Sequence, residues 1–267
     1  MSRERESRAI TLLGPAMAVT APMPAMTVTA RMPAITRPFE PPHLVLVPEQ
    51  PIVELELAPS SGPFDERVVM QNEPDSSRAR SYRLLRHRLL SSTDPRVIVV
   101  TSARAGEGKT TCAVNLALAI AEDSMTRVLL LDANLLRPAI GPLFGVVPSK
   151  TVIRNATWVA EVGPPYPVVS ILGTRLHVAP LPSEPLETGH LDRTALAVAL
   201  SDLREAYDYI VIDAASILES GDVDVVGECA NAAILATRAG RSRKGDVRRA
   251  LAQLAPVPVL GTALVDT

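Results

Sequence analysis

Short, continuously apolar runs alternate with amphipathic stretches along the chain from residue 77 onward. These runs have the length of buried strands, and they cover residues 97–102, 128–131, 176–179, 209–212, 233–236 and 257–260. Apolar positions recur at helical spacing in segments 77–91, 110–122, 193–206, 222–229 and 244–254. Buried strands that alternate with helices predict a mostly parallel sheet flanked by helices on both faces, the doubly wound α/β arrangement. Segment 145–173 fits neither period, so we expect an irregular excursion there.

The first quarter of the chain has a different pattern. An imperfect nine-residue period begins at Pro15, Pro24 and Pro33, and it is too short to stack into a solenoid. Prolines continue to about residue 63, so we expect residues 1–75 to form a disordered extension and residues 76–267 to form the folded domain. The uncharged stretch 9–30 follows a basic segment, as in an anchor, but its prolines exclude an apolar spanning helix.

Composition narrows the possible partners. The formal net charge is -2 over 267 residues, which gives no overall attraction to nucleic acid, and we expect no nucleic-acid partner. The two cysteines, Cys112 and Cys229, are far apart and lie in no metal-binding pattern. They predict neither a disulfide framework nor a zinc site, and the reducing cytoplasm is the expected compartment.

A glycine-rich loop joins the strand at 97–102 to the helix that follows it. Ala103, Gly108, Lys109 and Thr110 match the Walker A spacing, with strand before and helix after. In this motif backbone N–H groups and the helix dipole bind phosphate, the lysine adds a full charge and the hydroxyl ligates Mg²⁺. We therefore expect a P-loop NTPase fold that binds ATP and Mg²⁺. The expected nucleotide-binding set is Ala105, Gly106, Glu107, Gly108, Lys109, Thr110 and Thr111.

Two carboxylates stand where a triphosphate site needs them. Asp132 and Asp213 each close an apolar strand, and the ends of parallel strands meet at one edge of the sheet. The run 209–213 has the Walker B pattern, so Asp213 is the expected metal-holding residue. A strand-terminal helix cap is the structural alternative for Asp213.

Three segments, 101–111, 129–138 and 207–213, together resemble the bacterial tyrosine kinase (BY-kinase) family of capsule and exopolysaccharide synthesis. That family shares its scaffold with the Min and Par positioning ATPases. The resemblance implies that Asp132 acts on the attacking hydroxyl as a catalytic residue with Lys109 and Asp213. It also implies that Arg238 and Asp266 lie near the nucleotide. The implied function is a cytoplasmic kinase that regulates polysaccharide assembly or export with a membrane-embedded activator, recruited to the inner face of the membrane.

The chain departs from this family at several positions, and two of them lie in the segment 129–138. Asn134 stands where the family has a second aspartate, and Leu136 stands where it has an arginine. An amide oxygen ligates Mg²⁺ without offsetting its charge, so we expect Asn134 to be a weak metal ligand and phosphoryl transfer to be slow. Two other functions stay open: a catalytically weak ATP-binding regulatory subunit of the polysaccharide machinery, and a Min or Par type ATPase. Against the second stands Arg104, which occupies the position of the signature lysine.

The helix expected at 77–91 carries five arginines and no acid. The resemblance implies that this helix joins subunits of a homo-oligomer, and its charge also suits an anionic membrane. A plain solvated face is the structural alternative, because arginine stems cover apolar surface.

Overall fold

The computed structural model describes residues 52–57, 64–92, 96–148, 150–154, 157–158, 164–182 and 191–265. The strands are β1 (Val53–Leu57), β2 (Val97–Ser102), β3 (Val128–Ala133), β4 (Ile153–Arg154), β5 (Thr157–Trp158), β6 (Tyr166–Ser170), β7 (Leu176–Ala179), β8 (Tyr209–Ala214), β9 (Ala232–Arg238) and β10 (Val259–Val265). The helices are α1 (Val69–Asn72), α2 (Ser77–Ser92), α3 (Lys109–Ala121), α4 (Ile140–Phe144), α5 (Arg193–Ala206), α6 (Asp222–Cys229) and α7 (Lys244–Gln253).

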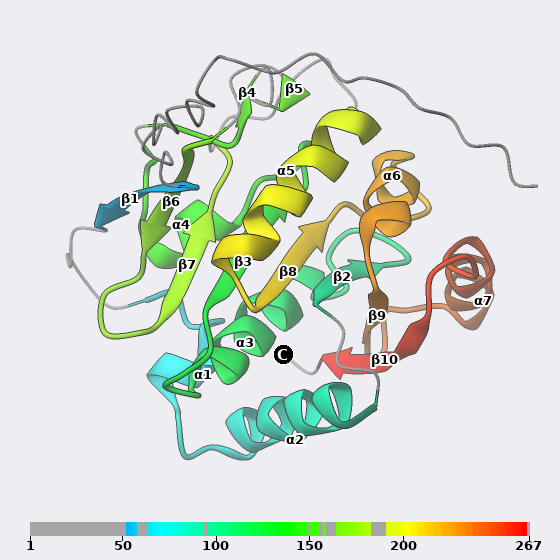
Figure 1. Ribbon diagram of the computed structural model, residues 1–267. Helices are drawn as coiled ribbons and strands as arrows, with labels where there is room; N and C mark the ends of the chain where they lie inside the picture. The colour runs from blue at the N-terminus through cyan, green and yellow to red at the C-terminus, as the bar shows by residue number, and fades with distance from the viewer. Residues whose placement is uncertain are drawn as a thin grey trace, which may run out of the picture. The chain divides into compact units, whose positions relative to one another are not determined.

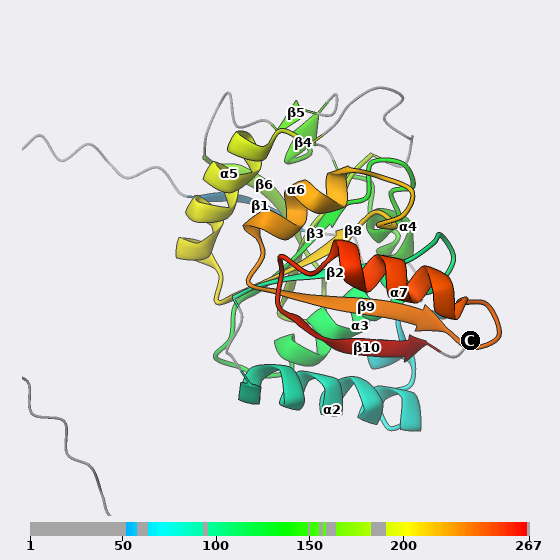
Figure 2. The same cartoon turned by 90° about the vertical axis from the view of Figure 1, so that its right-hand side faces the viewer.

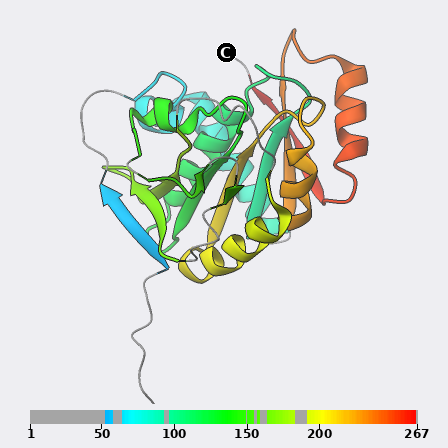
Figure 3. The ribbon, with the colours of Figure 1, turned by 90° about the horizontal axis from the view of Figure 1, so that it is seen from above.

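Eight of these strands form one sheet in the order β1-β6-β7-β3-β8-β2-β9-β10. Every neighbouring pair is parallel except β6 with β7, which is antiparallel. Strands β4 and β5 form a separate antiparallel pair. Figure 3 shows β1 at one end of the sheet and β10 with α7 at the other. The expected doubly wound, mostly parallel α/β fold is confirmed.

Alternate residues of the central strands supply two hydrophobic cores. In β2, Val97 and Val99 face the core that is covered by α5, α6 and α7, whereas Ile98 and Val100 face the core covered by α1, α2 and α3. Figures 1 and 2 show α5 and α6 on one side of the sheet, and α2 and α3 on the other. Because both faces are covered, each central strand is apolar along its whole length, which is the pattern seen in the sequence.

The helices and strands that the sequence predicted are present, with ends that differ by a few residues. Strand β6 is the main element that was not expected, since it lies within the segment 145–173 predicted to be irregular. Its sequence includes Pro167, and a proline argues against a central strand because it has no N–H to donate to a neighbouring strand. Pairing with β1 on one side and β7 on the other nevertheless places it inside the sheet.

Ordered structure begins earlier than residue 76, where the sequence placed the start of the domain. Strand β1 pairs with β6, and the side chains of Val68, Val69 and Met70 are at most 3% exposed. Asn115 of α3 fixes this segment: its Oδ1 accepts a hydrogen bond from Met70 N at 2.9 Å, and its Nδ2 donates to Arg67 O at 2.7 Å. The expected extension 1–75 is therefore too long at its carboxyl end, and residues 1–51 lie outside the described residues.

The arginines of α2 have partners within the chain. Arg83 binds both carboxylate oxygens of Glu122, and Arg86 donates to Ala119 O at 2.7 Å and contacts Glu122 at 3.4 Å. Glu122 follows α3, so the two guanidinium groups join α2 to the carboxyl end of α3, where the helix dipole favours positive charge. The acidic partner inferred for this helix therefore lies, for these two arginines, in the same chain. Self-association through α2 stays a prediction.

Among the residues that the structure describes, no helix is long and apolar enough to cross a membrane.

We expect Met70→Ala to lower the free energy of unfolding by about 2–4 kcal/mol, because it leaves a cavity beneath α3. Met70 is 3% exposed and belongs to the core around α3. Met125→Ala is the matched control, since this side chain is 85% exposed and its loss should cost less than about 0.5 kcal/mol. Urea unfolding measures both; equal losses would mean that the segment before α2 adds nothing to the core.

Candidate nucleotide-binding site

The loop between β2 and α3 has the backbone of a phosphate cradle. Gly106 and Gly108 have φ values of 77° and 91°, in the left-handed region that favours glycine. A Cβ atom would also meet neighbouring side chains, which are close to the backbone at Gly108 and the flexible end of an arginine at Gly106. A Cβ on Gly108 would lie 2.8 Å from the Val265 side chain, and one on Gly106 would lie 2.8 Å from Arg241 Nη2. The loop is thus packed from outside by residues that follow β9 and end β10.

Two carboxylates hold the loop backbone. Glu107 is 2% exposed, and its Oε2 accepts a hydrogen bond from Arg104 N at 2.9 Å. Glu219, in the segment between β8 and α6, accepts from Ala105 N at 3.3 Å. The Glu107 side chain is therefore engaged inside the protein, so any contact of this residue with phosphate falls to its backbone.

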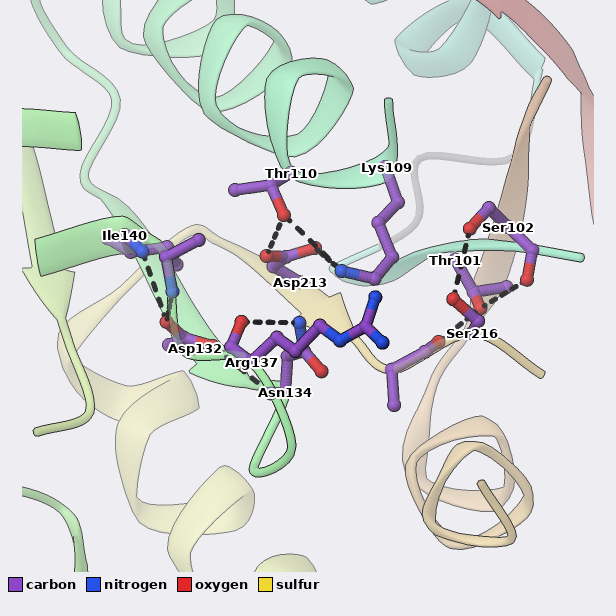
Figure 4. A network of polar contacts seen from close by, with 12 residues as sticks. Thr101, Ser102, Lys109, Thr110, Asp132, Asn134, Arg137, Ile140, Asp213 and Ser216 are labelled. Carbon is purple, nitrogen blue, oxygen red and sulfur yellow. Dashed lines mark hydrogen bonds and ion pairs between the residues drawn. The ribbon is translucent and has the colours of Figure 1, made fainter. Parts of the chain in front are cut away.

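Lys109, Thr110 and Asp213 meet at the amino end of α3 (Figure 4). Thr110 Oγ1 donates to Asp213 Oδ2 at 2.7 Å. Lys109 Nζ lies 3.4 Å from Thr110 Oγ1 and 3.9 Å from Asp213 Oδ1. The three residues expected from the Walker A and Walker B patterns thus form one cluster, although they come from two distant segments.

Asp213 has a buried oxygen that accepts no hydrogen bond from the described chain. The carboxylate is 0% exposed, and Oδ1 has no hydrogen-bond partner. Burial raises the pKa of Asp213, whereas the Lys109 charge and the Thr110 hydrogen bond oppose that rise. A buried carboxylate oxygen that accepts no hydrogen bond and lies beside a hydroxyl is the hard-oxygen environment that Mg²⁺ prefers. These residues therefore fit the metal that a P-loop site uses.

Asp132 lies directly beside Asp213, because the two residues are register partners in β3 and β8. Its Oδ1 accepts from Asn134 N at 3.1 Å, and its Oδ2 accepts from Ala139 N at 3.0 Å and Ile140 N at 3.1 Å. Burial, together with the Asp213 charge, raises the pKa of Asp132. The carboxylate thus organises the loop before α4 in the manner of a cap, and its catalytic role stays a prediction.

Asn134 also has a structural contact. Its Nδ2 donates to Arg137 O at 2.7 Å, and Arg137 N donates to Asn134 O at 3.1 Å, which closes a tight turn. Leu136, inside that turn, is 50% exposed. Arg137 lines the same cavity as Lys109, so the arginine that follows Leu136 in the sequence reaches the site from the next position.

Three cavities border the loop, two of them beside Thr110 and Thr111. One, of about 390 Å³, lies over the loop, and its lining includes Gly106, Lys109, Thr110, Asn134, Arg137 and Glu219. The other, of about 490 Å³, lies between α2 and the end of β10. Six lining residues are apolar, namely Val69, Tyr82, Leu85, Ala263, Leu264 and Val265, and six are polar or charged, namely Glu66, Arg67, Glu73, Arg78, Ser81 and Thr111. Thr111 therefore stands next to a cavity whose size and mixed walls suit a small organic group with polar substituents.

The remaining expected site residues are more distant from this cluster. Arg238 Nη1 donates to Gly106 O at 3.4 Å, so it contacts the loop. Asp266 lies outside the described residues. Arg104 Nε pairs with Asp246 Oδ2 of α7 at 2.7 Å, which ties it to its own chain, and this pair lowers the pKa of Asp246.

The sequence analysis did not single out Glu219 or Arg241. Both lie in loops after strands that flank β2, and the carboxyl ends of such strands surround the P-loop in this fold. That position was the available signal. Their contacts with Ala105 N and with Gly106 depend on loop conformations that the sequence pattern does not specify.

Sheet, loop and cluster define a protein with the P-loop NTPase fold. A ParA family model, described as NUBPL iron-transfer P-loop NTPase, matches residues 95–215. The kinase domain of VpsO superimposes with a TM-score of 0.59 at 28% identity, covering 71% of this chain and 96% of that domain.

Within the P-loop NTPase fold, the chain is similar in sequence to proteins of known name. The chain is 28% identical over 198 residues to tyrosine-protein kinase YwqD of Bacillus subtilis (strain 168), covering 72% of this chain and 81% of YwqD. It is 27% identical over 195 residues to succinoglycan biosynthesis transport protein ExoP of Rhizobium meliloti (strain 1021), of which it covers 24%. The expected resemblance to the bacterial tyrosine kinases, and through the shared scaffold to the ParA group, is confirmed.

We expect the stability of the nucleotide-free protein to fall as pH rises. The pKa of Asp132 is raised to about 7, so the folded protein keeps a proton that the unfolded chain has already released. That contribution is present at low pH and is lost as pH rises through about 7. The midpoint of thermal unfolding should therefore decline between about pH 6.5 and pH 8.5.

The window starts at about pH 6.5 because His177 titrates with the opposite sign below it. Burial lowers the pKa of His177, so its contribution is lost as pH falls. Asp132→Asn removes this group, so the decline should become smaller in this variant whatever its overall stability, and the raised pKa values of Asp213 and Cys112 account for what remains. If the unfolding midpoint of Asp132→Asn declines with pH as much as that of the unsubstituted protein, the proton is held by a group other than Asp132.

Proposed function

We propose that the protein is an ATP-dependent phosphotransferase of the bacterial tyrosine kinase type. Its substrate is a tyrosine hydroxyl, and it regulates exopolysaccharide or capsule assembly from the cytoplasmic face of the membrane, together with a membrane protein. The Oδ1 of Asp213, buried without a hydrogen-bond partner beside Thr110 and Lys109 at the P-loop, is the observation that carries the proposal. The similarity to YwqD and ExoP supports the reaction and the setting.

The residues have distinct roles in this proposal. The loop amides from Ala105 to Thr111 and the Lys109 ammonium bind the β- and γ-phosphates. Thr110 and Asp213 hold Mg²⁺, which when bound offsets phosphate charge. Asp132 orients the acceptor hydroxyl, and its three backbone N–H contacts keep it in place for that role.

The nucleoside occupies the cavity of about 490 Å³ beside Thr111. In a P-loop the chain of phosphates leads past the residue after the Walker A threonine, and Thr111 holds that position. Tyr82 of α2 and Val265 at the end of β10 supply the walls against which a base can pack. Arg238 acts from outside by holding Gly106 O.

A regulatory subunit that binds ATP without transferring phosphate is the second candidate. It is favoured by Asn134, whose amide closes a turn instead of adding a second carboxylate to the metal site. A Min or Par type ATPase is the third candidate, supported by the ParA family match. In that class a signature lysine stands at the position of Arg104 and reaches across subunits. Arg104 instead pairs with Asp246 of the same chain.

We expect Lys109→Ala to weaken ATP binding by at least about 100-fold, because it removes the ammonium group that lies beside Thr110 and Asp213 at the amino end of α3. Lys150→Ala is the matched control: Lys150 forms an exposed ion pair with Glu54 at 2.9 Å, remote in sequence from the loop. Isothermal titration calorimetry with ATP and Mg²⁺ measures both affinities. Equal ATP affinity of the two variants would show that the nucleotide does not bind at this loop.

The fate of the γ-phosphate distinguishes the three functions. Label from γ-labelled ATP should appear on tyrosine for the kinase, as free phosphate alone for the ATPase, and in neither product for the regulatory subunit. We expect slow tyrosine labelling, and Asn134→Asp should raise it by about tenfold if a second carboxylate is limiting. Loss of the Nδ2 donor to Arg137 O opposes this gain, so thermal unfolding of the variant is measured alongside. Fast labelling by the unsubstituted protein would show that Asn134 is no defect.

A further inference from the structure

An arginine-lined cavity of about 480 Å³ lies next to the cavity over the P-loop. Its arginines come from three separate segments: the P-loop, the turn after β3 and the segment between β9 and α7. They are Arg104, Arg137, Arg241 and Arg243, and Glu107, Glu219 and Asp246 also line the cavity. We refer to it as the arginine cavity.

The acids of this cavity are already engaged. Asp246 is 7% exposed and forms ion pairs with Arg104 and Arg249. Glu107 is buried and accepts a hydrogen bond from Arg104 N, and Glu219 accepts a hydrogen bond from Ala105 N. The negative charges therefore face inward or are paired, with Glu219 alone exposed.

Three of the arginines have the opposite character. The side chains of Arg137, Arg241 and Arg243 are exposed, and none has a hydrogen-bond or acid partner in the part of the chain that the structure describes. Like charges held together repel one another, and the cost falls when an anion binds between them. Guanidinium groups bind carboxylates through paired N–H donors, which makes this cluster suited to acidic side chains.

The position of the arginine cavity limits what its ligand does. Ala105, Arg137 and Glu219 line both this cavity and the one that contains Lys109 and Thr110. A chain seated among the arginines therefore extends directly into the space over the P-loop. A concave site of this volume admits the side chains of a peptide, whereas a flat bilayer surface contacts only the residues at the rim of the cavity.

We propose that the arginine cavity is the docking site for an acidic peptide segment that carries the phosphoacceptor tyrosine. Carboxylates of the segment bind Arg137, Arg241 and Arg243, and the neighbouring tyrosine enters the cavity over Lys109. The assignment of the acceptor rests on the proposed kinase function. The binding itself does not, since it follows from the unpaired arginines and needs no phosphoryl transfer.

The test compares two charge reversals close together in the chain. Arg243 precedes α7, makes no side-chain cap contact and lines the arginine cavity but not the phosphate cavity. Arg248 lies on α7, is also exposed and does not line the arginine cavity. Arg243→Glu and Arg248→Glu thus change the net charge equally, and only the first changes the proposed site.

The probe is a fluorescent peptide with one tyrosine flanked by glutamates, and its lysine counterpart is the charge control. Fluorescence anisotropy with the full chain is recorded with and without a non-hydrolysable ATP analogue and Mg²⁺. We expect the acidic peptide to bind, Arg243→Glu to weaken it by about tenfold or more, and Arg248→Glu to weaken it less than about twofold. Added salt should weaken binding in all cases.

Other results would overturn the proposal. Equal losses in the two variants would mean diffuse attraction by the whole surface, and equal binding of the lysine peptide would exclude charge recognition. Cosedimentation with phosphatidylserine-containing vesicles that is lost in Arg243→Glu, without peptide binding, would make this face a membrane contact. Absence of ATP-analogue binding would instead contradict the proposed function, and the nucleotide-free titration would still decide whether the peptide binds.

Discussion

Two carboxylates buried side by side at the ends of β3 and β8 are the constraint around which the site is built. Asp132 and Asp213 are register partners and both are 0% exposed, so their charges repel in a poorly solvated place. The chain offsets this differently for each. Asp132 receives three backbone N–H groups, whereas Asp213 accepts one hydroxyl hydrogen bond at Oδ2, and its Oδ1 has only the Lys109 charge at 3.9 Å and no hydrogen bond.

Because their contacts differ, Asp132 and Asp213 have different roles in the site. Because Asp132 gathers amides from residues 134, 139 and 140, it shapes the loop that presents Arg137 to the phosphate cavity. Because Asp213 Oδ1 accepts no hydrogen bond, it is the oxygen that suits the proposed Mg²⁺ next to Lys109 and Thr110. One carboxylate thus fixes the geometry and the other keeps the capacity to bind.

The arginines of the chain illustrate how much their surroundings decide. Arg83 and Arg86 are neutralised by Glu122 and by a helix end, so they join α2 to α3. Arg137, Arg241 and Arg243 have no acid partner among the described residues and line the arginine cavity, which shares Arg137 with the cavity over the P-loop. The first group stabilises the fold, and the second leaves positive charge exposed beside the loop.

The sequence by itself determined the strands, the helices and the phosphate loop. Burial of a strand on both faces, as in β2 and β8, requires an unbroken apolar run, and the Walker spacing places Lys109 and Thr110 at a helix start whatever surrounds them. Only the tertiary structure decided that Arg83 meets Glu122, that Asp132 is held by three amides, and that β6 joins the main sheet despite Pro167. The physical reason is that periodicity records which side of an element is buried, whereas these contacts depend on which distant segment packs against it.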